Sequence, residues 1–185
     1  MAYDEQHFER VIKEVQRHLE DTEVSKLAHW HAAAVYHKRH KFYVGLPASC
    51  LSIIVTWLLS IRLDTALLSG QGLALFATQA SITLSLIVSI LTGLGTFLNF
   101  NDLATRHRTA AENLHALWRD CKNWETDFPD HSFCEKAVQA VQQCRKRLND
   151  INRDSPQIPK WAWKSVRVQQ EEGSTSYKVD EATGN

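Results

Sequence analysis

Seven oxygen-bearing side chains recur at helical spacing in the middle of the chain. Steps of 3, 4, 4, 3, 4 and 3 residues place them on one face of a helix: Thr78, Ser81, Ser85, Ser89, Thr92, Thr96 and Asn99. In membranes, such faces most often let helices approach closely and bond to one another. Hydroxyl oxygens can also replace part of an ion's water shell without carrying a charge. The spacing therefore predicts either a helix-packing surface or the lining of a wet pore, and the residues leave both open.

Two further sets of polar residues extend this pattern. A shorter hydroxyl series precedes it, at Ser49, Ser52, Thr56 and Ser60. Asn101 and Asp102 follow the long series directly. Repeated by symmetry in an oligomer, Asn99, Asn101 and Asp102 would ring a pore mouth and attract cations, while in the alternative interpretation Asp102 is an ordinary interfacial residue.

Histidines form the second group that could do chemistry, since the chain has nine of them. His37 and His40, spaced i and i+3, could share a metal or sense pH, and His107 could be brought close to them by the chain's return. His29, His31 and His115 lie in the same parts of the sequence. No Cys or carboxylate stands at a matching spacing, so interfacial or core-packing histidines are the commoner interpretation. We expect no resident metal and no cofactor.

The remaining residues do not favour catalysis. Cys50, Cys121, Cys134 and Cys144 form no CxxC motif, and because the last three are expected in the cytoplasm we predict reduced thiols. The chain contains no nucleophile elbow, phosphate-binding loop or catalytic carboxylate pair. We therefore predict that the protein is not an enzyme, and we expect no nucleic-acid partner.

The elements that carry these residues are set by two uncharged runs. No Asp, Glu, Lys or Arg occurs from Phe42 to Ile61 or from Thr65 to Asn101. A bilayer core of about 30 Å takes roughly 20 helical residues, so each run is long enough to cross it. We predict spans at about 44–61 and 73–100, joined by a loop over 62–72 in which Gly70 and Gly72 are turn residues. A mean hydropathy of −0.31 conceals these spans because both ends of the chain are polar.

Charge asymmetry predicts the topology of this hairpin. Basic residues are concentrated before the first span and after the second, whereas the predicted loop has only Arg62. The positive-inside rule then places both termini in the cytoplasm. Because residues 1–40 are charged throughout, we expect no cleavable signal peptide. The protein is predicted to be a multi-pass protein of a plasma membrane or a bacterial inner membrane.

Apolar residues at spacings of three and four predict helices in both polar arms. Residues 1–41 are expected to form a short amphipathic helix and, from an N-cap at Asp21 or Thr22, a second one that runs into the membrane. Residues 102–165 are expected to continue span two without a break, turn at 128–130, and add one more helix that closes at 154–156. Trp161 and Trp163 would contact either a membrane surface or this cytoplasmic bundle. Residues 166–185 are assigned to a disordered tail.

These expectations define a fold class. The chain is predicted to be an all-α membrane protein, a two-transmembrane helical hairpin over residues 42–101 whose long helices continue into a cytoplasmic helical bundle.

The order of these features resembles the SLATT domain, a family of two-transmembrane effector domains associated with nucleotide-synthesising and nucleotide-sensing proteins. The resemblance covers about residues 5–165 and is carried by AAVYH at 33–37, LP at 46–47, ATRHRTAA at 104–111, LHAL at 114–117 and SPQIP at 155–159. It implies a pore-forming effector that acts in cell death or defence. Since the chain has no sensor domain of its own, the resemblance also implies a soluble sensor or nucleotide-signalling partner.

Two functions follow as expectations. The first is a homo-oligomeric pore in a lipid bilayer that conducts ions, cations by preference, with span two lining the pore. Two spans cannot enclose a channel, so several copies of the chain are required. Four subunits is a guess from common closed symmetries. The alternative is a non-conducting membrane anchor whose cytoplasmic bundle recruits a partner.

Overall fold

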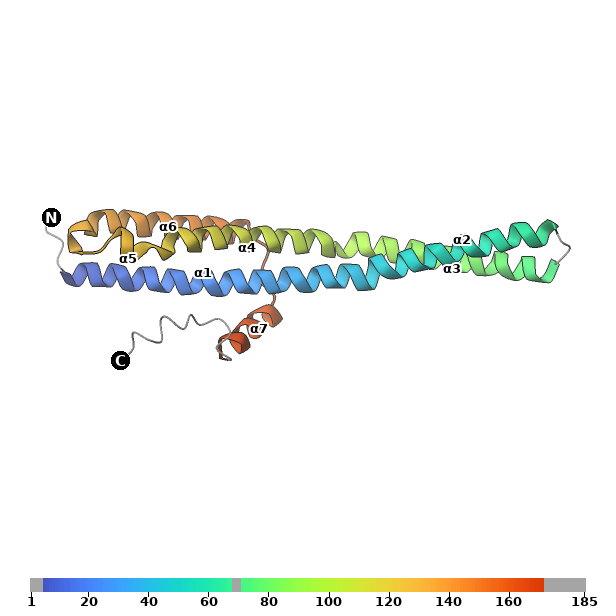
Figure 1. Cartoon of the computed structure of the whole chain (residues 1–185), viewed down its shortest axis with the longest axis horizontal. Coiled ribbons are helices and arrows are strands. Elements are labelled where there is room, and N and C mark those ends of the chain that lie inside the picture. Colours follow the sequence, from blue (N-terminus) through green and yellow to red (C-terminus); the bar gives the residue numbers. More distant parts are fainter. Residues whose placement is uncertain (1–4, 68–70, 172–185) are drawn as a thin grey trace. The chain divides into compact units, whose positions relative to one another are not determined.

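The computed structural model describes residues 5–67 and 71–171, and every element within these ranges is helical (Figure 1). This confirms the prediction of an all-α chain. In chain order the elements are α1 (Glu5–Arg39), the π-helical segment η1 (His40–Gly45), α2 (Leu46–Leu67), α3 (Gln71–Leu98), α4 (Phe100–Lys122), α5 (Trp124–Asp127), the 3-10 helix η2 (His131–Phe133), α6 (Cys134–Asp154) and α7 (Lys160–Glu171).

The chain divides into two compact units, each with its own packing. Of the described residues, the first unit takes 5–34 and 103–171, and the second takes 35–67 and 71–102. The helices α1 and α4 each contribute residues to both units.

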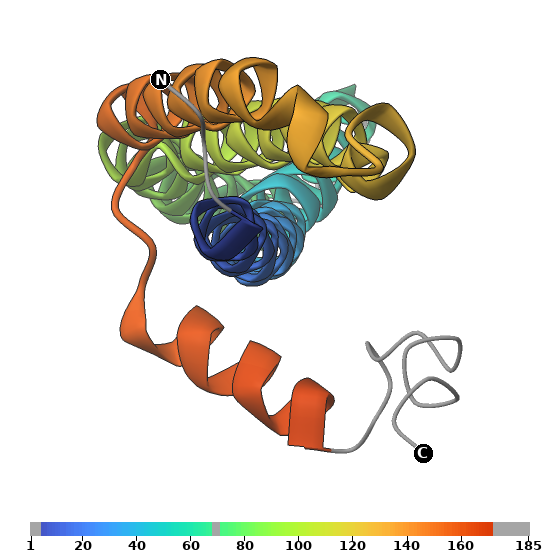
Figure 2. The same ribbon diagram turned by 90° about the vertical axis from the view of Figure 1, so that its left-hand side faces the viewer.

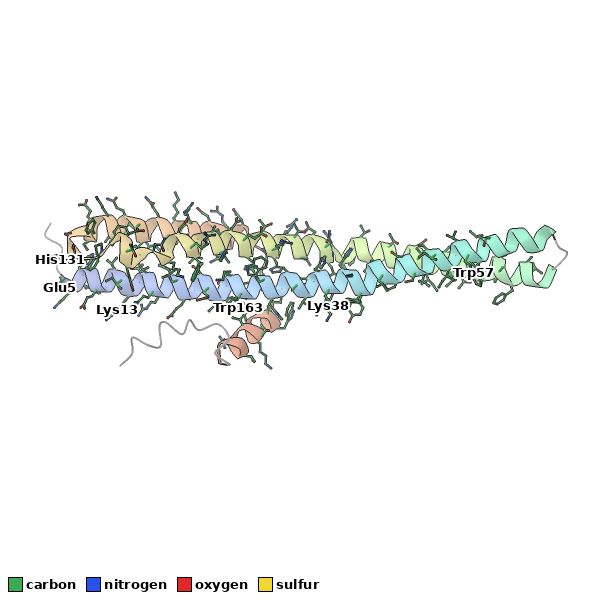
Figure 3. The ribbon with its side chains drawn as sticks, viewed as in Figure 1. Glu5, Lys13, Lys38, Trp57, His131 and Trp163 are labelled. Carbon is green, nitrogen blue, oxygen red and sulfur yellow. A yellow bond between two sulfur atoms is a disulfide. The ribbon has the colours of Figure 1, made fainter. Side chains whose placement is uncertain are left out.

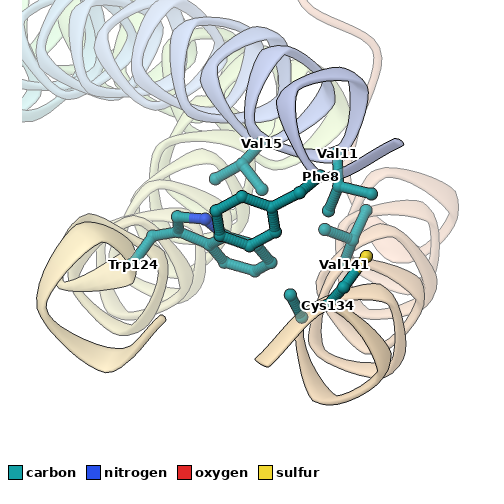
Figure 4. Packing of buried hydrophobic residues seen from close by; sticks show 7 residues of the cluster. Phe8, Val11, Val15, Trp124, Cys134 and Val141 are labelled. Atoms are coloured by element: carbon teal, nitrogen blue, oxygen red, sulfur yellow. The ribbon is translucent and has the colours of Figure 1, made fainter. Parts of the chain in front are cut away.

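The first unit is a helical bundle of the kind predicted for the two polar arms. Viewed end-on, α1, α4 and α6 lie around a shared interior (Figure 2). Phe8 and Val11 of α1 contact Val141 of α6 and Trp124 of α5 in one buried cluster (Figure 4). A second cluster joins the α4 residues Leu114 and Leu117 to Leu148 of α6. Removing these side chains from water is the main favourable contribution to the bundle.

One predicted helix boundary is wrong. A helix N-cap is predicted at Asp21 or Thr22, but α1 continues through both residues without interruption. Thr22 is 1% exposed and its hydroxyl donates to the carbonyl of His18 in the preceding turn. The apolar stripe continues past this point and the segment contains no Gly or Pro, so burial of the helix face outweighs the capping preference.

The predicted turn and final bundle helix are confirmed. Residues 128–130 are non-helical, Asp130 caps the next turn by accepting from the Ser132 N–H at 2.8 Å, and α6 ends at Asp154. The sulfur atoms of Cys121 on α4 and Cys144 on α6 face each other within bonding reach, a pairing that the expectation of reduced thiols does not include. Both residues lie on the facing stripes of their helices, a juxtaposition that sequence spacing does not reveal.

The segment with the two tryptophans forms α7, which is docked on the first unit. The Trp161 ring meets the His31 ring of α1 edge-on at a centroid distance of 5.7 Å, and Ala162 and Val166 are fully buried. The prediction of a disordered tail is wrong for residues 166–171, which are the last residues of α7. Burial of Val166 explains this difference. The remainder of the predicted tail, 172–185, lies outside the described residues.

The second unit is built on α2 and α3, which pack side by side along their length. Within the described ranges, two helical stretches contain a segment long and apolar enough to cross a membrane, one within Glu5–Ser60 and one within Ala74–Asp127. The helices also take up most of the predicted loop, since α2 ends at Leu67 and α3 begins at Gln71. Gly72 lies within α3 and Gly70 lies outside the described residues.

Both long helical stretches change geometry within this unit. Pro47 has no N–H to donate, and the preceding segment η1 is π-helical, with the Leu46 N–H donating to the Lys41 carbonyl five residues back. The prediction that one continuous helix runs from span two into residues 102 and beyond is wrong. Asn99 interrupts this helix between α3 and α4, with a backbone φ of 45°. Asn tolerates this left-handed conformation better than other non-glycine residues do.

Gly95 brings α3 into close contact with η1. A Cβ built at Gly95 would lie 2.5 Å from Cγ1 of Val44, whereas one at Gly93 would meet nothing within 4 Å. The two glycines therefore form a matched pair, of which only Gly95 is required for packing within the chain.

We predict that Gly95→Ala lowers the stability of the helix pair by about 1–3 kcal/mol, because the new methyl group overpacks against a β-branched side chain. Thermal unfolding of the detergent-solubilised protein, followed by circular dichroism, measures the effect. Gly93→Ala is the control and should leave the midpoint unchanged or raised. Adding Val44→Ala to Gly95→Ala should restore the midpoint, and equal midpoints for the two glycine variants would contradict the assigned contact.

Candidate functional site

The seven residues of the hydroxyl face all lie on α3 or directly after it, but they differ in exposure. Ser81 is 5% exposed, and Ala77 one turn earlier is 1% exposed. Thr78 is half-buried, whereas the other five are exposed: Ser85, Ser89, Thr92, Thr96 and Asn99. The structure thus keeps the series on one side of α3, with one end buried and the rest uncovered within the chain.

The hydroxyl hydrogens on this face are used within α3 itself. Five of the side chains donate to the carbonyl four residues earlier, at 2.7–3.0 Å: Thr78 to Ala74, Ser81 to Ala77, Ser89 to Ser85, Thr92 to Val88 and Thr96 to Thr92. A hydroxyl that donates in this way keeps its oxygen lone pairs available as acceptors. The exposed part of the face therefore presents uncharged acceptor oxygens.

The shorter hydroxyl series on α2 behaves in the same way. Ser49, Ser52, Thr56 and Ser60 are exposed and donate to carbonyls of their own helix or of η1 at 2.7–2.9 Å. The buried residues on α2 and α3 are instead mainly small or apolar, such as Leu58 and Ala77, and α3 meets η1 through the Val44–Gly95 contact. The hydroxyl bonds described here do not link the two helices.

The residues predicted for the pore mouth lie where α4 begins. Asn101 is exposed and Asp102 is half-buried in the first turn of α4. The change of backbone direction at Asn99 gives α4 an N-terminus of its own, and a carboxylate in the first turn interacts favourably with the helix dipole. Asp102 can therefore stabilise the start of α4, in addition to its predicted role of attracting cations at a pore mouth.

Of the three histidines predicted to sense pH or metal, His107 is hydrogen-bonded to His29, which was not among them. Nδ1 of His107 on α4 lies 2.8 Å from Nδ1 of His29 on α1, and each residue is 1% exposed. His37 is exposed near the end of α1 and His40 is half-buried in η1, both in the other unit. His29 and His107 both fall on the apolar stripe of their helix. This spacing is the feature of the sequence from which their burial could have been predicted.

A bond between two Nδ1 atoms requires one ring to donate and the other to accept, so at least the accepting ring is neutral. Burial, together with the neighbouring His107, lowers the pKa of His29 to about 4, and burial also lowers the pKa of His107. Among the described residues no group of three His, Cys, Asp or Glu side chains could hold a metal ion. Two nitrogens do not complete a zinc site, and the pair acts as a neutral hydrogen bond between α1 and α4.

A buried lysine lies one turn before His29 on the same helix. Lys26 is 7% exposed, its Nζ lies 4.4 Å from the centroid of the Trp118 ring, and it pairs with Glu23 at 3.8 Å. Burial lowers its pKa from the usual value. The cation–π contact and the carboxylate together offset part of the desolvation of this ammonium group.

No protein-family model, curated protein or solved structure matches this chain. The function must therefore be argued from the arrangement of its own residues.

The histidine pair predicts a loss of stability in acid. The folded protein holds His29 neutral down to pH of about 4, whereas the unfolded chain takes up the proton near pH 6.5. Stability is therefore greatest above pH 6.5 and falls as the pH is lowered toward 4, by up to about 3 kcal/mol for a shift of this size. The midpoint of thermal unfolding at several pH values in one detergent measures it.

His29→Gln removes the titrating group and should flatten this pH profile, whatever it does to the midpoint at pH 7. His37→Gln is the matched control for stability, because His37 is exposed and lies in the second unit. Its unfolding profile should follow that of the wild type, and a role of His37 in pH sensing would be measured in the current instead. A His29→Gln profile parallel to the wild-type one would assign the acid sensitivity to other groups.

Proposed function

We propose that the chain assembles as a homo-oligomer in a membrane and conducts cations along the hydroxyl face of α3. The observation that carries this proposal is the exposed run of Ser85, Ser89, Thr92 and Thr96 on a helix apolar enough to cross a bilayer. Oxygens that face hydrocarbon without a partner are costly, so a polar face on such a helix is expected to meet water or another protein surface.

The proposed pore requires several copies of the chain. Two helices cannot surround an aqueous path, whereas a ring of copies with α3 toward the axis would place the hydroxyl face on the pore wall. In this arrangement α2 stands outside α3 and faces lipid. Trp57 of α2, labelled in Figure 3, is 62% exposed and suits such a position. Four copies is the subunit number that we take as the working hypothesis.

Cation preference is supported by the chemistry of the face. Its outward groups are acceptor oxygens, and neither uncharged run contains a Lys or Arg that would repel a cation. Asp102 would add negative charge at the cytoplasmic end of each copy. The hydroxyls supply partial rather than full charges, so we expect weak selectivity among monovalent cations.

The remaining parts of the proposal concern topology and control. Both arms are placed in the cytoplasm, in a plasma membrane or bacterial inner membrane, and the bundle would supply assembly contacts. The resemblance to SLATT domains suggests an effector in defence or cell death, opened by a soluble sensor or nucleotide-signalling partner. His37, His40 and His107 remain proposed sensors of pH or metal.

If α3 lines a pore, a large apolar side chain on its hydroxyl face should reduce the current, whereas the same side chain elsewhere on α3 should not. Ser89→Leu should reduce or abolish single-channel current in planar bilayers, because it replaces an acceptor oxygen on the pore wall by a large apolar group. Thr83→Leu is the matched control. Thr83 is also exposed and also donates to the carbonyl four residues earlier, at 3.0 Å, but it lies outside the hydroxyl series.

Both variants should form oligomers of wild-type size by crosslinking. Loss of oligomers in Ser89→Leu would mean that the hydroxyl face packs helices. Wild-type current in Ser89→Leu would remove the face from the conduction path. Silent bilayers for the wild type under all ion and pH conditions would favour the non-conducting anchor.

A further inference from the structure

The first unit contains a cavity that the proposed pore does not use. It has a volume of about 260 Å³ and lies among α1, α4, α5 and α6. Its apolar wall is formed by Val15, Leu117, Phe128, Ala140 and Val141. Small-molecule sites are usually apolar clefts with a few placed polar groups, and this volume suits a molecule of one or two rings.

Two residues on this wall, Trp124 and His18, carry buried nitrogen atoms without a hydrogen-bond partner among the described residues; in His18 these are the two ring nitrogens. Trp124 lines the cavity and is 7% exposed, and its indole Nε1 is buried without a hydrogen-bond partner among the described residues. The ring is held by Phe128, at a centroid distance of 4.6 Å, and by the cluster around Phe8. Figure 4 shows the indole nitrogen on the edge of the ring that is turned toward Val15, another residue of the cavity wall.

An N–H group left unpaired in a buried position costs about 1–3 kcal/mol. An acceptor atom supplied by a bound molecule would recover this cost without moving the protein. The fixed ring and the unused donor therefore indicate a place where an acceptor is expected to sit.

The charges around the cavity argue against an anionic molecule. Its lining includes two carboxylates, Asp120 and Asp127, but only one basic group that is always charged, Arg147. Arg147 is already paired with Asp120 at 2.9 Å, and both side chains are more than 60% exposed. A phosphate or carboxylate placed here would meet a net negative surrounding, which raises the free energy of binding.

We propose that this cavity binds a small uncharged molecule with an apolar ring and one hydrogen-bond acceptor, which accepts from Nε1 of Trp124. The site lies wholly within the first unit and does not depend on conduction by α3. It adds a ligand-binding function to the helical bundle, distinct from the pore proposed above.

Acetophenone is a suitable probe, because it has one ring, a carbonyl acceptor and no donor. Ethylbenzene is the matched probe of similar shape without the acceptor. The full-length protein in detergent is prepared with 5-fluorotryptophan, and the fluorine resonance of Trp124 among the six tryptophans is assigned with Trp124→Phe. Acetophenone should shift this resonance saturably at millimolar concentrations, and should bind about tenfold more tightly than ethylbenzene, the ratio expected for one recovered hydrogen bond.

Two variants separate the site from general effects. Ala140→Leu fills the cavity and should abolish the saturable shift. If this variant does not fold, Trp124→Phe keeps the ring without the donor, and the difference between the two probes in raising the unfolding midpoint should disappear. Equal binding of both probes to the wild type, shifts of Trp57 and Trp163 with the same concentration dependence, or no saturable shift of Trp124 would each overturn the proposal.

Discussion

The apolar surface of α2 and α3 is the constraint on which the rest of the molecule depends. Large side chains stand uncovered on these helices, with Ile53 70%, Leu75 71% and Phe97 84% exposed. Exposing a surface of this kind to water is unfavourable, and in the proposed assembly it would lie against lipid or against other copies of the chain. Hydroxyls that bond to their own helix backbone leave no donor unpaired, and their remaining lone pairs can accept from water or from another chain.

The helical bundle of the first unit follows the rules of a water-soluble core. Its apolar residues are buried among themselves, and several of its buried polar groups are matched, as in the His29–His107 bond and the contact of Lys26 with Trp118. Against this background the unpaired Nε1 of Trp124 is, like the ring nitrogens of His18, an exception. Its position on a cavity wall gives that exception a physical interpretation, since an acceptor can enter without displacing a side chain.

Two local irregularities shape the second unit. The π-helical segment before Pro47 and the left-handed backbone at Asn99 occur in different helical stretches. Contacts connect their surroundings, because Val44 of η1 meets Gly95 four residues before Asn99, and Tyr36 stacks on Phe100 at 6.1 Å. Short irregular segments of this type often mark places where helices bend or move. They are therefore the natural positions at which a motion of the helices would be concentrated.

Sequence periodicity by itself determined the all-helical fold, the two long apolar helices, the hydroxyl face of α3 and the turn at 128–130, because side-chain spacing and charge directly set which helix faces can be buried. Other features arise where segments distant in sequence meet. Tertiary structure alone decided that α1 passes through Thr22, that His107 faces His29 rather than His37 or His40, that Cys121 faces Cys144, and that Trp124 lines a cavity. Each of these depends on which residue stands opposite on another helix, and spacing within one helix does not contain that information.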